Sequence, residues 1–91
     1  MTDKQFIRIS KALADPRRFA ILQAIASERS EVMCKDLLKQ FRVTPATMSH
    51  HLKELSTSGL IEARKEAQCM YISARRDVVA DYRAELLKRL G

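Results

Sequence analysis

The chain has 91 residues, 46% of them hydrophobic and 31% charged, and a formal net charge of +6. This composition excludes a disordered chain, and the length allows one domain with one core, spanning residues 1–91. The excess of lysine and arginine favours a polyanionic partner, nucleic acid before a membrane surface. No segment approaches the roughly 20 apolar residues that cross a bilayer, and the N-terminal stretch lacks the apolar run of a secretory signal. We therefore expect a cytoplasmic protein.

Two helices are predicted at the start of the chain. The first, at about residues 4–14, is indicated by apolar residues at helical spacing: Phe6, Ile9 and Leu13. Asp15 and Pro16 form a cap and first-turn signal for the second helix, over residues 16–27. The second helix is apolar nearly all round, and one face consists of Phe19, Leu22, Ile25 and Ala26. Such a helix is typically buried, so we expect it at the centre of the core.

A short third helix is predicted over residues 32–41, and Arg42 and Val43 connect it to a fourth. Its inward-facing residues are Leu37, Leu38 and Phe41. A glycine is common in the turn of a helix-turn-helix and is absent here. The sequence therefore predicts either an unfavourable backbone geometry at Arg42 or a turn of another type.

The fourth helix, over residues 44–58, begins with a capping threonine and a first-turn proline and ends at Gly59. At 100° per residue, one side carries Met48, Leu52, Leu55 and, at its edge, His51. The opposite side carries small or polar residues: Ala46, Thr47, Ser49, His50 and Lys53. Such a face fits the DNA major groove, although a solvated surface helix is the alternative for this feature taken alone.

The last third of the chain predicts two strands and a helix. The strands lie near residues 60–64 and 69–73, with a charged tip at residues 65–68 between them. A final helix over residues 77–90, capped by Asp77, carries an apolar stripe of Val78, Val79, Tyr82, Leu86 and Leu90. The order of elements predicts a mostly α (α+β) winged helix-turn-helix, with five helices and a two-stranded β-hairpin wing.

Four stretches together resemble the ArsR/SmtB-type winged-helix transcriptional regulators: ALADPRRFAILQAI, DLLKQF, VTPATMSHHLKELSTSGLI and ARKEAQCMYIS. The resemblance runs from about Lys11 to Ser73. It implies a homodimeric regulator of double-stranded DNA, with two recognition helices in successive major grooves of an inverted-repeat operator. On this resemblance, Thr47, Ser49 and His50 face DNA beside Thr44 and Ala46, and the phosphate contacts are Lys53, Arg64 and Lys65. Ala67 replaces the glycine frequent at the family's hairpin tip, which predicts a weaker wing.

The resemblance also implies that the first and last helices pack across a twofold axis. The residues alone favour the same arrangement, because a core of this size covers two terminal apolar stripes poorly. The expected dimer interface consists of Phe6, Ile9, Leu13, Val78, Val79, Tyr82, Leu86 and Leu90.

Other functions are less well supported by the residues. The Cys-x-Cys pair of arsenic-sensing members is replaced by Met33, Cys34 and Lys35, and no histidine accompanies the acids of the last helix, so we expect no metal site and no cofactor. The sequence contains no glycine-rich phosphate loop and no nucleophile motif, so we do not expect an enzyme. Two alternatives stay open. One is a thiol-redox-responsive regulator that uses Cys34 and Cys69, and the other is a winged-helix protein-interaction module. An effector is not identified.

Overall fold

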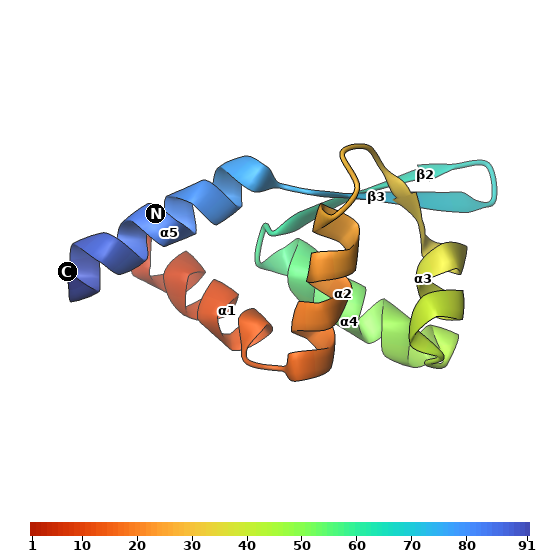
Figure 1. Cartoon of the computed structure of the whole chain (residues 1–91), viewed down its shortest axis with the longest axis horizontal. Coiled ribbons are helices and arrows are strands. Elements are labelled where there is room, and N and C mark those ends of the chain that lie inside the picture. Colours follow the sequence, from red (N-terminus) through yellow and green to blue (C-terminus); the bar gives the residue numbers. More distant parts are fainter.

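The computed structural model describes residues 1–91 and contains five helices and one three-stranded antiparallel sheet (Figure 1). In chain order the elements are α1 (Asp3–Leu13), α2 (Pro16–Ala26), β1 (Val32–Met33), α3 (Cys34–Phe41), α4 (Pro45–Thr57), β2 (Ile61–Glu66), β3 (Cys69–Ala74) and α5 (Arg76–Leu90). The molecule measures 42 × 22 × 21 Å. Its long axis runs from α1 and α5 at one end to the β2–β3 hairpin and α3 at the other. This is the winged helix-turn-helix that the order of elements predicted.

The helix boundaries follow from caps that the sequence signals. Asp15 Oδ1 accepts the backbone N–H of Arg18 at 2.9 Å, and Thr44 Oγ1 accepts that of Thr47 at 3.1 Å. Each cap precedes a proline in the first helical turn, where the missing N–H costs no hydrogen bond. Gly59 follows α4 with a φ of 90°, a left-handed geometry that glycine adopts without strain. The caps of α2 and α4 and the end of α4 are thus confirmed.

The cap predicted for the last helix is wrong. Arg75 occupies the cap position of α5 and makes no capping bond with its side chain. Asp77 lies inside the first turn and accepts two hydrogen bonds from the Arg75 guanidinium, at 3.2 and 3.0 Å. The carboxylate still stabilises the positive end of the helix dipole, but it does so from within the helix.

A third strand was not expected from the sequence. Val32 and Met33 form β1 and pair with Ile72 and Tyr71, so the sheet order is β1-β3-β2 with β3 in the middle. The sequence assigned these two residues to the third helix, which instead begins at Cys34. β1 covers the free edge of β3, which would otherwise expose unpaired backbone groups.

The core lies where α2 crosses α4 and the inner face of the hairpin. Ile21 and Ile25 from α2, Met48 and Leu55 from α4, and Ile72 from β3 have no exposed surface. The prediction that α2 is central is confirmed by these residues, but Phe19 on the same helix is 41% exposed. Phe19 lies near the start of α2, toward the side of α1 and α5, where the chain provides no element to cover it.

The turn between α3 and α4 contains a strained residue. Arg42 ends α3 in the left-handed conformation, with φ 52° and ψ 40°, and its N–H donates to the Leu38 carbonyl at 3.1 Å. This is the first of the two geometries that the missing turn glycine predicted. Ala67 at the hairpin tip is also left-handed, with a φ of 54°. Both positions favour glycine, so each carries a backbone cost.

Candidate nucleic-acid interface

α4 presents a polar face to solvent. Ala46, Thr47, Ser49, His50 and Lys53 are exposed, whereas the opposite side of the helix is buried through Met48, His51, Leu52 and Leu55. The helical period predicted this division. The exposed side chains are short apart from His50 and Lys53, so the helix backbone can approach the base edges of a major groove closely.

The two threonines at the start of α4 are linked. Thr44 Oγ1 accepts the backbone N–H of Thr47, and its hydroxyl donates to Thr47 Oγ1 at 2.9 Å. The Thr47 hydroxyl thereby keeps its own proton free to donate outward. Of the two threonines, Thr47 is thus the one with a free donor for a phosphate or base, while Thr44 fixes the start of the helix.

The adjacent histidines have different environments. His51 is 7% exposed, and its Nδ1 has no hydrogen-bond partner. Burial lowers the pKa of His51 below its ordinary value of 6.5, against the opposing attraction of the Asp15 carboxylate. His50 is exposed on the next position of the helix, and the two ring centroids are 6.1 Å apart. The structure therefore gives His51 a place in the packing and leaves His50 free on the surface.

The wing does not present Arg64 as a free cation. The Arg64 guanidinium donates to Glu31 at 2.7 and 3.0 Å, pairs with Glu66, and stacks 4.6 Å above the Tyr71 ring. The Glu31 and Glu66 carboxylates raise the pKa of Arg64 further above its ordinary value, and the hydrogen-bonded Arg64 guanidinium lowers the pKa of Glu31. The phosphate contact expected of Arg64 stays a prediction, and these ion pairs compete with it. Glu31 lies 33 residues away in sequence, so no local pattern predicted the pairing.

Lys65 is the cation of the wing that forms no ion pair. It is exposed, takes part in no ion pair, and lies opposite Met70 in the register of the hairpin. Because successive residues of a strand point to opposite faces, Lys65 projects from the face opposite to Arg64. The hairpin therefore offers one free positive charge near its tip.

The terminal helices contact each other within the chain. The Phe6 and Tyr82 rings are 5.1 Å apart, and Ser10 Oγ lies 2.7 Å from the Tyr82 hydroxyl. Arg89 stacks 4.2 Å over the Phe6 ring and is held by Asp3 and Glu85, at 2.6 and 3.0 Å. α5 is thereby fixed against α1 at the end of the molecule opposite the wing (Figure 1).

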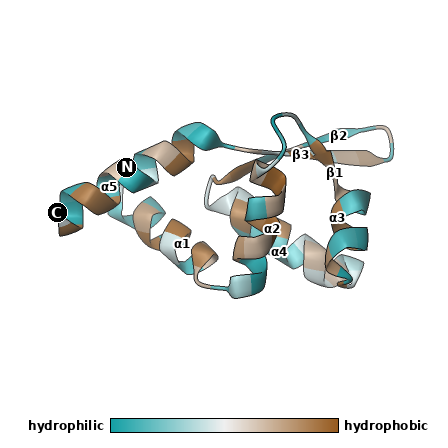
Figure 2. Cartoon of the chain, viewed as in Figure 1, coloured by the Kyte–Doolittle hydropathy of each residue, from teal (hydrophilic) through white to brown (hydrophobic).

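Two of the residues expected at a dimer interface are buried in the chain's own core. Ile9 is 0% exposed and Val78 is 9% exposed, so neither can contribute much surface to a partner. Phe6, Leu13, Tyr82 and Leu86 are partly buried, and Val79 and Leu90 are exposed. Leu87, which lies off the predicted stripe, is 63% exposed, and Ile7 is 49% exposed. Figure 2 shows apolar residues along α5 as far as its C-terminal end.

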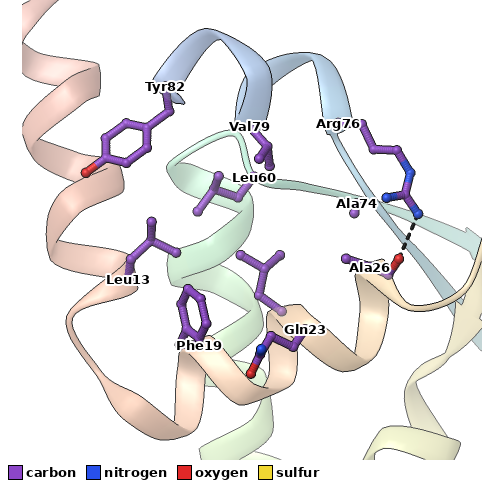
Figure 3. Close-up of a pocket in the computed structure, with 10 residues that line it drawn as sticks. Leu13, Phe19, Gln23, Ala26, Leu60, Ala74, Arg76, Val79 and Tyr82 are labelled. Carbon is purple, nitrogen blue, oxygen red and sulfur yellow. Dashed lines mark hydrogen bonds between the residues drawn. The ribbon is translucent and has the colours of Figure 1, made fainter. Parts of the chain in front are cut away.

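Between these helices lies an apolar groove of about 320 Å³ (Figure 3). Its walls come from α1, α2 and α5, and its lining consists of Leu13, Phe19, Leu22, Gln23, Ala26, Leu60, Ala74, Arg76, Val79 and Tyr82. Arg76 lies at the rim, where its Nη2 donates to the Ala26 carbonyl at 2.7 Å. The exposed ring of Phe19 is therefore part of a larger apolar surface next to α5.

Metal-ligating and thiol groups are dispersed. No three His, Cys, Asp or Glu side chains gather in one cluster. Glu85 pairs with Arg89, and Asp77 pairs with Arg75. Cys34 and Cys69 are half-buried free thiols, and burial raises the pKa of Cys34. A raised pKa lowers the thiolate fraction and with it the reactivity of Cys34.

Comparisons with known proteins agree with this geometry. Residues 13–64 match the family described as "Helix-turn-helix domain". The uncharacterized HTH-type transcriptional regulator YceK of Bacillus subtilis is 31% identical over 83 residues, which cover 91% of this chain and 83% of YceK. The arsenical resistance operon repressor of Staphylococcus xylosus is 37% identical over 71% of this chain and 61% of its own length.

One solved structure is similar along nearly the whole chain. It is the solution NMR structure of a homodimeric winged helix-turn-helix DNA-binding domain from Mycobacterium bovis, described as a possible ArsR-family transcriptional regulator. Its TM-score is 0.76 at 27% identity, covering 98% of this chain and 87% of that one. The chain belongs to the ArsR/SmtB family. The family consists of transcriptional regulators with a winged helix-turn-helix, which is the fold observed here. No helix combines the length and apolar composition that a membrane crossing requires.

Proposed function

We propose that this ArsR/SmtB-family chain is a homodimeric repressor that acts in the cytoplasm on an inverted-repeat operator. The observation that carries the proposal is the outward face of α4, on which Thr47, Ser49, His50 and Lys53 are all exposed and none is held by an ion pair. Hydroxyl and imidazole groups can bond to base edges, and an ammonium group can bond to phosphate. α4 therefore reads the sequence while the lysines supply affinity that does not depend on sequence.

Dimerisation is supported by surface that the chain cannot cover. Val79, Leu87 and Leu90 on α5 are 44%, 63% and 83% exposed, and Phe19 lines the groove together with Val79. The similar Mycobacterium bovis domain is homodimeric. A twofold axis next to α1 and α5 would bury these apolar groups and place two α4 helices on one side of the assembly.

The reading face is tested by selecting bound duplexes from a random pool and measuring the affinity of variants for the selected sequence. Ser49→Ala and His50→Ala should each reduce discrimination against mismatched duplexes, by about 1–3 kcal/mol for a lost base contact. Lys53→Ala and Lys65→Ala should weaken binding to all duplexes alike and lower the dependence on salt by about one phosphate contact per protomer. Wild-type affinity and preference in both the Ser49 and His50 variants would show that another surface reads the DNA.

The assembly is tested by sedimentation equilibrium. Leu87→Asp should shift the protein toward monomer, because it places a charge in the apolar interface. Lys88→Asp is the matched control on the neighbouring, exposed position. If Leu87→Asp leaves the wild-type mass unchanged, the α5 surface is not the dimer interface. A wild type that binds protein partners without retarding any duplex would instead indicate an interaction module.

A further inference from the structure

Arg17 lies at the turn between α3 and α4, although it belongs to α2. It is the second residue of α2, and its Nη1 lies 3.4 Å from the carbonyl oxygen of Phe41, the last residue of α3. A hydrogen bond of this length is weak, so it locates the guanidinium without consuming its charge. Arg17 is exposed and takes part in no ion pair. Its remaining N–H groups have no protein acceptor.

Arg42 directly follows Phe41 and places a second guanidinium at the same turn. Its side chain is exposed and has no hydrogen-bond or ion-pair partner. Its backbone is left-handed, with a φ of 52°, at a position where glycine would be free of strain. The backbone N–H of Arg42 is bonded to the Leu38 carbonyl, but its guanidinium has no partner in the folded chain and is therefore free to bind an anion.

The two arginines flank the start of the helix proposed to read DNA. Arg42 lies two residues before Thr44, the cap of α4. α2 and α4 also contact each other directly. Figure 1 shows the start of α2 and the α3–α4 turn on the same edge of the molecule, with the wing on the opposite edge. The free lysine of the wing and this pair therefore lie on different sides of α4.

Asp15, two residues before Arg17, does not neutralise the pair. The Asp15 carboxylate caps α2 through the N–H of Arg18 and forms no ion pair with Arg17. Because Asp15 occupies the end of the helix, the backbone N–H groups of α2 are not an anion site. Any anion at this edge would be held by the two side chains.

We propose that Arg17 and Arg42 form a clamp on the DNA backbone, in which each guanidinium binds a phosphate beside the N-terminal end of α4. The clamp rests on the proposed DNA-binding function. Arginine binds phosphate with two parallel N–H groups, and such contacts fix the position of a protein on the duplex without reading its sequence. The clamp sets the register of α4 in the groove from the side that the wing does not reach.

The test is the salt dependence of binding to a mixed-sequence duplex of about 30 base pairs. Such a duplex offers backbone phosphates to the clamp but contains no operator sequence. The neutral variants are Arg17→Gln and Arg42→Asn, and asparagine tolerates the left-handed backbone. Each should lower the slope of log K against log salt by about 0.9 per protomer, hence about 1.8 per dimer, with additive effects in the double variant. Arg17→Lys and Arg42→Lys should retain most of the slope.

Arg29→Gln is the matched control. Arg29 is an exposed cation without an ion pair just beyond the opposite end of α2, and its removal should leave the slope at the wild-type value. An equal loss in this control would mean that net charge alone matters, which overturns the clamp. Arg42→Gly serves as a second neutral variant in case Arg42→Asn folds poorly.

The clamp and the proposed function fail in different ways. If both arginine variants keep the wild-type slope while Lys53→Ala lowers it, the protein binds DNA through α4 and the clamp is wrong. If the wild type retards no duplex, the proposed function is wrong and the clamp fails with it. A changed base preference in the arginine variants would assign them to sequence reading and also overturn the phosphate clamp.

Discussion

Replacing Arg42 with glycine should stabilise the folded chain. The Arg42 backbone is left-handed at the end of α3, which costs about 1–2 kcal/mol for a residue with a Cβ atom. Glycine removes this cost but gives the unfolded chain more freedom, which offsets about 0.5–1 kcal/mol of the gain. The Arg42 side chain has no partner whose loss would oppose the change. The free energy of unfolding should therefore rise by about 0.5–1 kcal/mol.

Urea denaturation of Arg42→Gly and wild type at one protomer concentration measures this difference, because the stability of a dimer depends on concentration. The melting temperature should rise by about 4 °C for a domain of this size. Gly59→Ala is the control of opposite sign. Its φ is 90°, and its Cβ would lie 3.4 Å from Gln5 Nε2, so backbone strain rather than a clash should destabilise it by about 1 kcal/mol. A loss of stability in Arg42→Gly would refute the strain at this turn.

Three further changes test the core, the buried histidine and the wing. Met48→Ala should lower the free energy of unfolding by about 2–5 kcal/mol in urea titrations, because the side chain is fully buried. Since burial lowers the pKa of His51, the unfolded chain takes up the proton first. Wild-type stability should therefore fall as the pH drops below about 6.5, and His51→Gln should lose this part of the pH profile. Glu31→Gln should release Arg64 from its main ion pair and raise the affinity for mixed-sequence duplex DNA, measured by fluorescence anisotropy, with little change in melting temperature; an unchanged affinity would mean that Arg64 stays away from DNA.

Local signals predicted the central part of the molecule well. Asp15 with Pro16 and Thr44 with Pro45 are pairs of adjacent residues, and each marks a helix start that the structure has at the same place. The inner and outer faces of α4 follow from the 3.6-residue period, because one side of that helix packs on a core and the other meets solvent. These features depend on a few neighbouring residues, so they can be predicted from the sequence without knowledge of the tertiary structure.

The differences arise where distant residues decide the structure. Val32 becomes a strand because Ile72, 40 positions later, supplies the partner backbone. Phe19 stays exposed because α1, α2 and α5 leave an open groove beside it. Arg64 is held in an ion pair because the fold brings Glu31 next to the wing. In each case the local pattern is compatible with either outcome, and only the tertiary arrangement distinguishes them.

The net charge of +6 does not by itself indicate which surface binds DNA. The cations that remain outside ion pairs indicate it. The cations held by acids are Arg64, Arg75 and Arg89. A phosphate that binds these arginines competes with a carboxylate, whereas a phosphate that binds a free cation displaces only counterions. Cations without an ion pair lie at the α3–α4 turn, where Arg17 contacts Phe41 and Arg42 follows it, and on the wing at Lys65. The salt dependence of DNA binding should therefore come from these residues and Lys53, and the committed arginines should stabilise the wing and α5 instead.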